Sequence, residues 1–305
     1  METTIQPELF NPMLAGEGVV GEISYPKLAS PKLNGVRGLI QNNTLYARSL
    51  KPIVNNFVQD YFSGRPVLNG LDGELVVGYF GDKAVFTRTT SGVMSQDGEP
   101  DVRLYVFDYL TDTTKHLPFK DRNSIAKQLV QRLGDGRTVW VRQKLVHNDE
   151  EMQAFAKATL DLGFEGLVLR CPNALYKHGR STDKEGTFLR FVPWHTSEAV
   201  ILDVLEGEIN GNESVVNELG YLKKSSAKAG KIPSGQAGSF KVQDLKTKAI
   251  FHMPVPGDEF QKAVWSTRGW WASKQIIRYK YKDGVKGDIP RYAQYEGLRA
   301  EEDMS

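Results

Sequence analysis

The stretch SPKLNGVRG, residues 30–38, places Lys32 among residues that favour tight turns. A lysine amine attacks phosphorus only when it is neutral, and the ordinary lysine pKa of about 10.4 leaves roughly one amine in a thousand neutral near pH 7.5. Neighbouring cations such as Arg37 and Arg48, together with a metal-bound triphosphate, would favour the neutral form. The pattern is short, so by itself it indicates a surface lysine more strongly than a nucleophile.

The residues around this lysine predict an α+β domain over residues 1–195. LIQNNTLYARS (39–49) has two apolar runs around Asn42-Asn43, which is typical of a β-hairpin. Apolar spacing predicts strands at LDGELVVG (71–78), DVRLYVFDYL (101–110) and EGLVLR (165–170). It predicts helices at VNNFVQDYF (54–62), DRNSIAKQLVQRLG (121–134) and DEEMQAFAKATLDLG (149–163), the last two with acidic caps and terminal glycines. Strands interspersed with helices indicate the α+β class.

Residues 196–305 are richer in strand-forming residues and predict a small β-barrel domain. The β-rich segments are EAVILDVLEG (198–207), GSFKVQDLKTKAIFHMPV (238–255) and QIIRYKYKDG (275–284), with one helical candidate at 258–265. The first two segments flank a basic stretch, about 207–238, in which lysines lie among glycine, serine and alanine. Its lysines are Lys223, Lys224, Lys228 and Lys231. We expect this stretch to be a mobile loop, acting either as a clamp on nucleic acid or as a solvated linker.

Composition limits the compartment and the partners. A chain of 305 residues suffices for about two domains, and a formal net charge of +2 does not by itself indicate a polyanionic partner. Cys171 is the single cysteine, which excludes internal disulfides and thiolate zinc sites. We find no signal peptide and no run of about 18 apolar residues. These features predict a cytoplasmic protein without a membrane partner.

Two predicted strands carry acids on otherwise apolar faces. Because side chains alternate along a strand, Asp72 and Glu74 share one face of residues 71–78, and Glu165 shares one face with Leu167. A carboxylate in such a setting is costly unless it binds a cation or a hydroxyl. We therefore expect these acids to bind a ligand.

Five further segments follow the lysine in order, and the whole series resembles the motifs of covalent nucleotidyltransferases. The segments are ARSLK (47–51), LDGEL (71–75), VFDYL (106–110), FEGLVLR (164–170) and YKHGRSTDKEGTFLRF (176–191). The resemblance is strongest to ATP-dependent DNA ligases, in particular the small ligases of phages and large viruses. NPMLA (11–15) and the ending IIRYKYKDG…IPRYAQYEGLRAEED (276–303) extend it over nearly the whole chain.

This resemblance implies a nucleotidyltransferase domain of ATP-grasp-like antiparallel sheets with helices, followed by an OB-fold barrel. It implies that Lys32 attacks the α-phosphate of ATP, expels pyrophosphate and carries AMP as a phosphoramidate. The AMP would then pass to the 5′-phosphate at a nick in duplex DNA, and the 3′-hydroxyl would displace it to seal the strand. The implied cofactors are ATP and Mg²⁺ or Mn²⁺, and the implied partner of the monomeric enzyme is nicked duplex DNA.

The resemblance also implies roles for further side chains. The nucleotide would be contacted by Ser30 at the adenine edge, Phe107 and Leu167 on the adenine faces, Glu74 at the ribose, and Arg37, Arg48 and Arg190 at phosphates. Glu165 and Asp72 match the divalent-metal positions. Candidates for DNA contact are Asn34, Arg37, Arg48, Arg180 and Ser181, together with the four lysines of the basic stretch. Arg291, Arg299 and Asp303 match the family's last motif, which orients pyrophosphate.

Two motifs depart from the family pattern. Asn34 stands where the family usually has Asp, which keeps the hydrogen-bonding reach but removes an anion beside the lysine. Arg190 and Val192 stand where the family has two lysines, so one phosphate ligand is missing. A lost charge-assisted bond typically costs about 1.5–3 kcal/mol. We expect compensation by the metal, by Arg190, or by Lys184 or His195.

Two other functions stay open at this point. The same nucleotide chemistry serves RNA ligases and mRNA-capping guanylyltransferases, although the segment YKHGRSTDKEG favours a DNA ligase. A decayed site would leave a nick-binding protein, although the presence of Lys32, Glu74 and Glu165 weighs against it. We do not expect NAD dependence, because the chain has room neither for a nicotinamide-recognising domain ahead of Lys32 nor for a four-cysteine zinc module.

Overall fold

The computed structural model describes residues 9–299, apart from residue 83 and the segments 217–220 and 283–288. The chain divides into two compact units, Met1–Val192 and Pro193–Ser305. The division lies close to the predicted boundary at residue 195, and each unit is described by itself.

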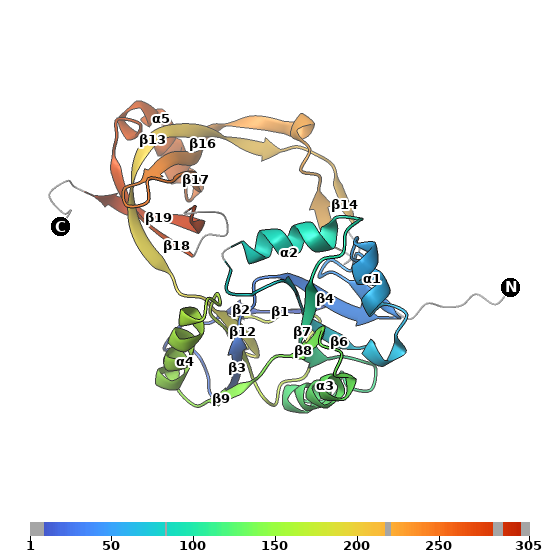
Figure 1. The fold of residues 1–305 in the computed structure, drawn as a ribbon. Coiled ribbons are helices and arrows are strands. Elements are labelled where there is room, and N and C mark those ends of the chain that lie inside the picture. The colour runs from blue at the N-terminus through green and yellow to red at the C-terminus, as the bar shows by residue number, and fades with distance from the viewer. Residues whose placement is uncertain (1–8, 83, 217–220, 283–288, 300–305) are drawn as a thin grey trace. The chain divides into compact units, whose positions relative to one another are not determined.

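Two five-stranded sheets and one short strand pair form the first unit (Figure 1). The first sheet has the order β5-β4-β6-β7-β8, and its strands are β4 (Val36–Gln41), β5 (Thr44–Tyr46), β6 (Leu71–Val77), β7 (Val102–Tyr109) and β8 (Thr138–Trp140). The second has the order β2-β12-β10-β3-β9, and its strands are β2 (Gly16–Glu17), β3 (Lys27–Pro31), β9 (Lys144–Val146), β10 (Leu167–Arg170) and β12 (Phe188–Phe191). The pair is β1 (Met13–Leu14) with β11 (Gly179–Arg180).

Four helices pack on these sheets. They are α1 (Asn56–Phe62), α2 (Val85–Met94), α3 (Phe119–Leu133) and α4 (Asp149–Asp161). The structure confirms the three predicted helices, but α3 begins before its expected acidic cap, and α4 is capped by Asn148, whose side chain accepts from the amide of Glu151 at 2.9 Å. α2 was not predicted, because its threonines and Gly92 are poor helix formers.

The predicted hairpin and the apolar alternation explain where the cores lie. Asn42 and Asn43 adopt φ of 50° and 59°, as a two-residue hairpin turn requires, and β4 pairs with β5 on either side of them.

One core lies between the first sheet and α1, α2 and α3, and includes Leu71, Leu75, Leu104, Val106 and Ala126. Another lies between the second sheet and α4, and includes Ala29, Met152, Ala156, Leu167 and Leu169. The two sheets therefore have separate cores.

The second unit is a five-stranded antiparallel sheet of order β17-β16-β13-β18-β19, covered by two helices. Its elements are β13 (His195–Asn210), β16 (Lys231–Asp244), β17 (Ile250–Pro254), β18 (Ile276–Lys282), β19 (Arg291–Arg299), α5 (Asp258–Ser266) and α6 (Arg268–Trp271). Within the described residues no ladder joins the edge strands β17 and β19. In the described part of the chain, no helix has the length and apolar content needed to cross a membrane.

The prediction that 207–238 is a loop is wrong for most of that stretch, because its described residues largely pair in strands. β13 and β16 stay paired as far as Asn210 and Lys231, and β14 (Ser214–Val216) pairs with β15 (Leu222–Lys224) in a second small hairpin (Figure 1). The polar composition favoured a loop in the prediction. A two-stranded ribbon with solvent on both faces can nevertheless be polar throughout, because neither face packs on a core.

Candidate active site

Lys32 lies at the point where β3 leaves the second sheet. Its amide donates to the carbonyl of Gly166 at 2.8 Å, and the amide of Glu165 donates back to the carbonyl of Lys32 at 3.3 Å. This exchange brings the start of β10 beside the lysine, and the two side chains form an ion pair. Lys32 is 28% exposed and Glu165 19% exposed, so a ligand can reach both.

Two glycines permit this close packing of loops. A Cβ on Gly35 would lie 2.1 Å from the carbonyl oxygen of Leu75, so the loop after Lys32 can approach β6 only without a side chain there. Gly166 has φ of +146°, and a Cβ on it would lie 2.2 Å from the carbonyl oxygen of Phe191. Gly35 thus allows the loop after Lys32 to approach β6, and Gly166 allows the segment before β10 to approach the end of β12.

Glu74 faces this loop from the first sheet. Burial raises the pKa of Glu74 to about 7, although the charges of Lys32 and Arg37 and the amide of Gly35 act against that rise. Glu165 adds to it by like-charge repulsion. Lys32 is therefore within electrostatic reach of two carboxylates, one from each sheet.

Arg37 and Asp72 form a bidentate pair on the same side of the first sheet. Nε of Arg37 donates to Oδ1 of Asp72 at 2.7 Å, Nη2 donates to Oδ2 at 2.6 Å, and Nη1 donates to the carbonyl of Met13 at 2.9 Å. Burial would lower the pKa of Arg37, but Asp72 outweighs burial and raises it. Both oxygens of Asp72 accept from Arg37, so a metal at Asp72 would share this carboxylate with the guanidinium.

Phe107 lies on β7 beneath this pair. The guanidinium carbon of Arg37 lies 5.0 Å from the centre of the Phe107 ring. The amide of the Asn123 side chain donates to the carbonyl of Phe107 at 2.9 Å and fixes the backbone there. An aromatic ring is thus held in the first sheet beside the arginine and the acids.

The prediction that Leu167 covers the adenine face opposite Phe107 is wrong. Leu167 is fully buried in the core that faces α4, and so is Leu169, because Gly166 breaks the alternation before β10 begins. Glu165 therefore does not share a strand face with them. Val168 lies on the other face of β10, where it pairs in register with Ser30, which is only 3% exposed. The alternation rule failed because it was counted through a glycine outside the strand.

The predicted phosphate ligands Arg48 and Arg190 and the predicted DNA contact Asn34 differ in whether their side chains have partners. Arg48 is exposed at the tip of a turn closed by the amide of Leu50 donating to the carbonyl of Ala47 at 2.9 Å. Asn34 is half-buried in the nucleophile loop. Neither side chain has an ion-pair or hydrogen-bond partner in the described parts of the chain. Arg190 instead pairs with Glu17, its Nε lying 2.8 Å from the carboxylate.

Arg180 and Ser181 have different surroundings. Arg180 is exposed and donates to the carbonyl of Ala15 at 2.7 Å. Ser181 is fully buried, its hydroxyl bonds to that of Thr187 at 2.8 Å, and it accepts from the amide of Phe188 at 3.2 Å. The expectation that Ser181 contacts DNA is therefore wrong for this conformation, because its hydroxyl holds the turn before β12.

The second unit carries the other basic residues. Lys223 and Lys228 are exposed and have no partner in the part of the chain that the structure describes. Lys224 donates to the carbonyl of Asn210 at 3.0 Å, and Lys231 pairs with Glu208 at 2.9 Å. Lys223 and Lys224 lie on β15, Lys231 begins β16, and Lys228 begins the short 3-10 helix η2 (Lys228–Gly230) between them.

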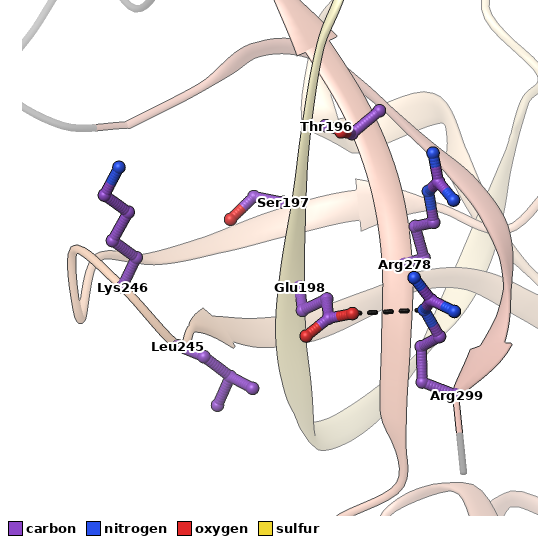
Figure 2. A pocket seen from close by; sticks show the side chains of 7 residues that line it. All are labelled: Thr196, Ser197, Glu198, Leu245, Lys246, Arg278 and Arg299. Carbon is purple, nitrogen blue, oxygen red and sulfur yellow. Dashed lines mark ion pairs between the residues drawn. The ribbon is translucent and has the colours of Figure 1, made fainter. Parts of the chain in front are cut away.

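A hollow of about 360 Å³ in this unit includes one residue of the predicted last motif. It is lined by Thr196, Ser197, Glu198, Leu245, Lys246, Arg278 and Arg299. Figure 2 shows Glu198 and Arg299 pointing toward each other, and their ion pair measures 3.1 Å. Arg291 begins β19 and packs on Tyr292, while Asp303 lies outside the described residues. The predicted pyrophosphate ligand Arg299 therefore has an internal carboxylate partner.

Sequence reasoning missed a buried charge cluster next to Phe107. Asp108 is fully buried and accepts from Nε and Nη2 of Arg122 at 2.9 and 3.1 Å and from Nη1 of Arg170. Burial raises the pKa of Asp108, but Arg170 and Arg122 outweigh it and hold that pKa below its usual range. The sequence signal for this cluster is Asp108 itself, an acid within the apolar strand VFDYL and next to Phe107.

The donor set near Lys32 fits a hard divalent cation. Glu165 raises the pKa of Glu74 by like-charge repulsion, so a cation bound at Glu165 would weaken that repulsion. Among the described residues no group of three His, Cys, Asp or Glu side chains could hold a metal alone. Mg²⁺ commonly binds one or two carboxylates together with water and substrate phosphates, which matches what this site offers.

Comparison with known proteins gives a consistent result. The family model "ATP dependent DNA ligase domain" matches residues 12–184. A probable DNA ligase of Streptomyces griseus is 30% identical over 219 residues, which is 64% of this chain and 42% of that protein, so the match spans about two-fifths of the relative.

Solved structures resemble the chain in fold. The Chlorella virus DNA ligase-adenylate is 24% identical, with a TM-score of 0.55 over 96% of this chain and 100% of that one. A Lig E DNA ligase structure is 20% identical, with a TM-score of 0.72 over 96% of this chain and all of the other. At these identities the likeness shows the fold alone.

Proposed function

This chain belongs to the ATP-dependent DNA ligase family, and we propose that it seals nicks in duplex DNA through an AMP attached to Lys32. The observation that supports this best is the position of Lys32, paired with Glu165 and within electrostatic reach of Glu74. An accessible amine beside carboxylates that can bind a cation, followed by a loop that Gly35 holds against β6, suits attack on a metal-bound phosphate.

The first step forms a P–N bond and breaks a P–O bond. The Lys32 nitrogen attacks the α-phosphorus of ATP, pyrophosphate leaves, and AMP stays on the lysine. Lys32 is held by Glu165 in this structure, so it must lose both that ion pair and a proton before attack. A divalent cation bound at Glu165 would supply Lewis-acid stabilisation of the phosphate charge. The cation and the Lys32 amine would compete for the oxygens of Glu165, so metal binding would release the amine from its ion pair.

The remaining residues of the first unit would bind the nucleotide and the nick. We assign adenine stacking to Phe107, the ribose to Glu74, and phosphates to Arg48 and to Arg37, whose Asp72 pair keeps its guanidinium oriented. Arg190 would exchange Glu17 for a phosphate. In the second and third steps the 5′-phosphate takes the AMP from Lys32, and the 3′-hydroxyl displaces AMP. Asn34 is free to contact that hydroxyl.

The two units suit a division of labour. We propose that residues 1–192 are the adenylylation domain and that residues 193–305 form an OB-fold whose β14–β15 hairpin and exposed lysines hold DNA phosphates. Arg291 and Arg299, with Asp303, would orient pyrophosphate during adenylylation. We further propose that the enzyme acts as a monomer in the cytoplasm, where a chain with Cys171 as its single cysteine needs no disulfide.

The departures from the family pattern bear on the alternatives. Val192 supplies no phosphate ligand, yet its Cα lies 3.1 Å from where a Cβ on Gly166 would be, directly beside the Lys32 loop. A nick-binding protein without catalysis would not need the Lys32–Glu165 pair, or the close backbone contacts at Gly35 and Gly166 beside it. We therefore favour an active ligase over a binding protein.

A gel assay of nick sealing tests this proposal. We expect sealing with ATP and Mg²⁺, no sealing by Lys32→Ala, and a mass gain of one AMP on the wild-type chain alone. GTP in place of ATP, and RNA ends in place of nicked DNA, test the capping-type and RNA-ligase alternatives. If nick binding persists while fresh ATP and Mg²⁺ add no AMP to the wild type, the chain is a binding protein instead.

A further inference from the structure

A buried ion pair joins the two five-stranded sheets of the first unit. Asp108 lies on β7 of the first sheet and Arg170 on β10 of the second, and they are 0% and 3% exposed. The connection matters because the candidate site takes Lys32 from one sheet and Phe107 from the other.

The same arginine contacts the ring next to Asp108. The guanidinium carbon of Arg170 lies 5.6 Å from the centre of the Phe107 ring, which also contacts Arg37 at 5.0 Å. Arg170 is itself packed between Phe119 at 4.6 Å and Phe188 at 4.1 Å, so its position is constrained on several sides. Arg170 of the second sheet therefore contacts both the Phe107 ring and the carboxylate of the adjacent Asp108.

This arrangement is not the one that stability alone would favour. Nη2 of Arg170 is buried and has no hydrogen-bond partner among the described residues. A buried donor without a partner is destabilising, and apolar replacements of buried ion pairs are often neutral or stabilising. A group retained at such a cost calls for another explanation, and the geometry offers one.

We propose that Asp108 and Arg170 are positioning residues that set the distance between the adenine platform at Phe107 and the nucleophile Lys32. This inference rests on the proposed adenylylation of Lys32 by ATP. The amine can attack the α-phosphorus only if the base, held by one sheet, places that phosphorus beside a lysine held by the other. Displacements of about 1 Å are enough to lower a rate about a hundredfold when reacting groups are preorganised.

Arg122 provides a matched control. It is buried like Arg170 and bonds the same carboxylate, but it lies on α3, which packs on β7 and β8 of the first sheet, whereas Arg170 is itself a residue of the second sheet. Arg122→Met therefore tests the stability role of an arginine on Asp108, whereas Arg170→Met removes the inter-sheet contact as well. Arg170→Lys keeps a charge for Asp108 but loses the planar contact with Phe107.

The experiment measures adenylylation of Lys32 in single turnovers over a range of ATP concentrations, with GTP as a competitor and melting temperature in parallel. We expect Arg170→Met to raise the ATP concentration for half-maximal rate about tenfold and to weaken the preference for ATP over GTP. Arg122→Met should lower the melting temperature but leave both quantities within about twofold of the wild type. Arg170→Lys should fall between the wild type and Arg170→Met.

The outcomes separate this inference from the proposed function. If the wild type takes up no AMP on Lys32, the proposed function fails and this inference fails with it. If the wild type is active and Arg170→Met matches Arg122→Met in ATP dependence and nucleotide preference, only the positioning role is overturned. Should Arg170→Met not fold, the decision passes to Arg170→Lys: ATP dependence and preference within about twofold of the wild type overturn the inference, and a larger change supports it.

Discussion

Replacing Arg37 with Met should destabilise the first unit by about 3 kcal/mol, because it leaves Asp72 buried without its partner. The Asp72 side chain is 2% exposed and that of Arg37 10% exposed, so solvent screens their pair poorly. The substitution removes bonds of 2.7 and 2.6 Å to the carboxylate and one of 2.9 Å to the carbonyl of Met13. Breaking a buried pair of this kind typically costs about 3–5 kcal/mol, and the slight exposure of Arg37 argues for the lower end.

Hydrogen exchange followed by mass spectrometry measures this effect locally, which matters because a chain of two units need not unfold in one step. Exchange of the β6 amides, Leu71–Val77, gives the free energy of opening at Asp72 itself. Arg37→Met combined with Asp72→Leu should recover most of the loss, since no buried charge then stays unpaired. The exposed pair of Arg103 and Asp101 serves as a control, and Arg103→Met should change the free energy by less than about 1 kcal/mol.

The reasoning is refuted if Arg37→Met lowers the opening free energy of β6 by no more than Arg103→Met does. It is also refuted if the double variant is as unstable as the single one, because the loss would then not come from the orphaned carboxylate. A loss of activity without a loss of stability would show that Arg37 serves the ligand alone.

Three further predictions concern the nucleophile loop and the hairpin. The pKa of Glu74 is raised from 4.5 to about 7 in the folded chain, so its protonated form stabilises the fold at low pH. This contribution is lost as pH rises from about 4.5 to 7. Urea titrations of Glu74→Gln should therefore show a flatter pH dependence of stability over that window than the wild type. Gly166→Ala should lower stability by about 2 kcal/mol and slow AMP uptake, measured by thermal melting and mass spectrometry, since its Cβ would lie 2.2 Å from a carbonyl oxygen at φ of +146°; an unchanged melting temperature would contradict this. Lys223→Ala with Lys228→Ala should reduce the log–log salt slope of nick binding by about 1.8, at about 0.9 for each phosphate contact, whereas Lys231→Ala, whose amine already pairs with Glu208, should reduce it less; equal slopes for all variants would exclude the hairpin from the DNA contact.

Local chemistry made several features predictable from the sequence. Asn42-Asn43 specifies a hairpin because few other residues tolerate positive φ twice in succession, and the structure has that turn. The apolar periodicities of α1, α3 and α4 identify these helices. The ordered motifs around Lys32 pointed to the ATP-dependent DNA ligase family, and the family match agrees. Each of these signals lies within a few residues of the feature that it specifies.

Other features depend on contacts between segments far apart in the chain. Asp72 and Glu74 share a face as predicted, but Leu167 was assigned to the wrong face because Gly166 interrupts the strand that was counted through it. Ser181 looked available to DNA, yet its hydroxyl is consumed by a turn whose closure no local pattern shows. Polar composition likewise concealed the ordered hairpin between β13 and β16.

The bridge from Asp108 to Arg170 is the clearest case of a feature decided by tertiary structure. The two residues are 62 positions apart and lie in different sheets, so their meeting depends on how those sheets pack. The sequence could propose Lys32 as a nucleophile because the residues that suggest this role are adjacent to it. The distance from Lys32 to the Phe107 ring is set by the packing of two sheets, and a linear pattern does not encode it.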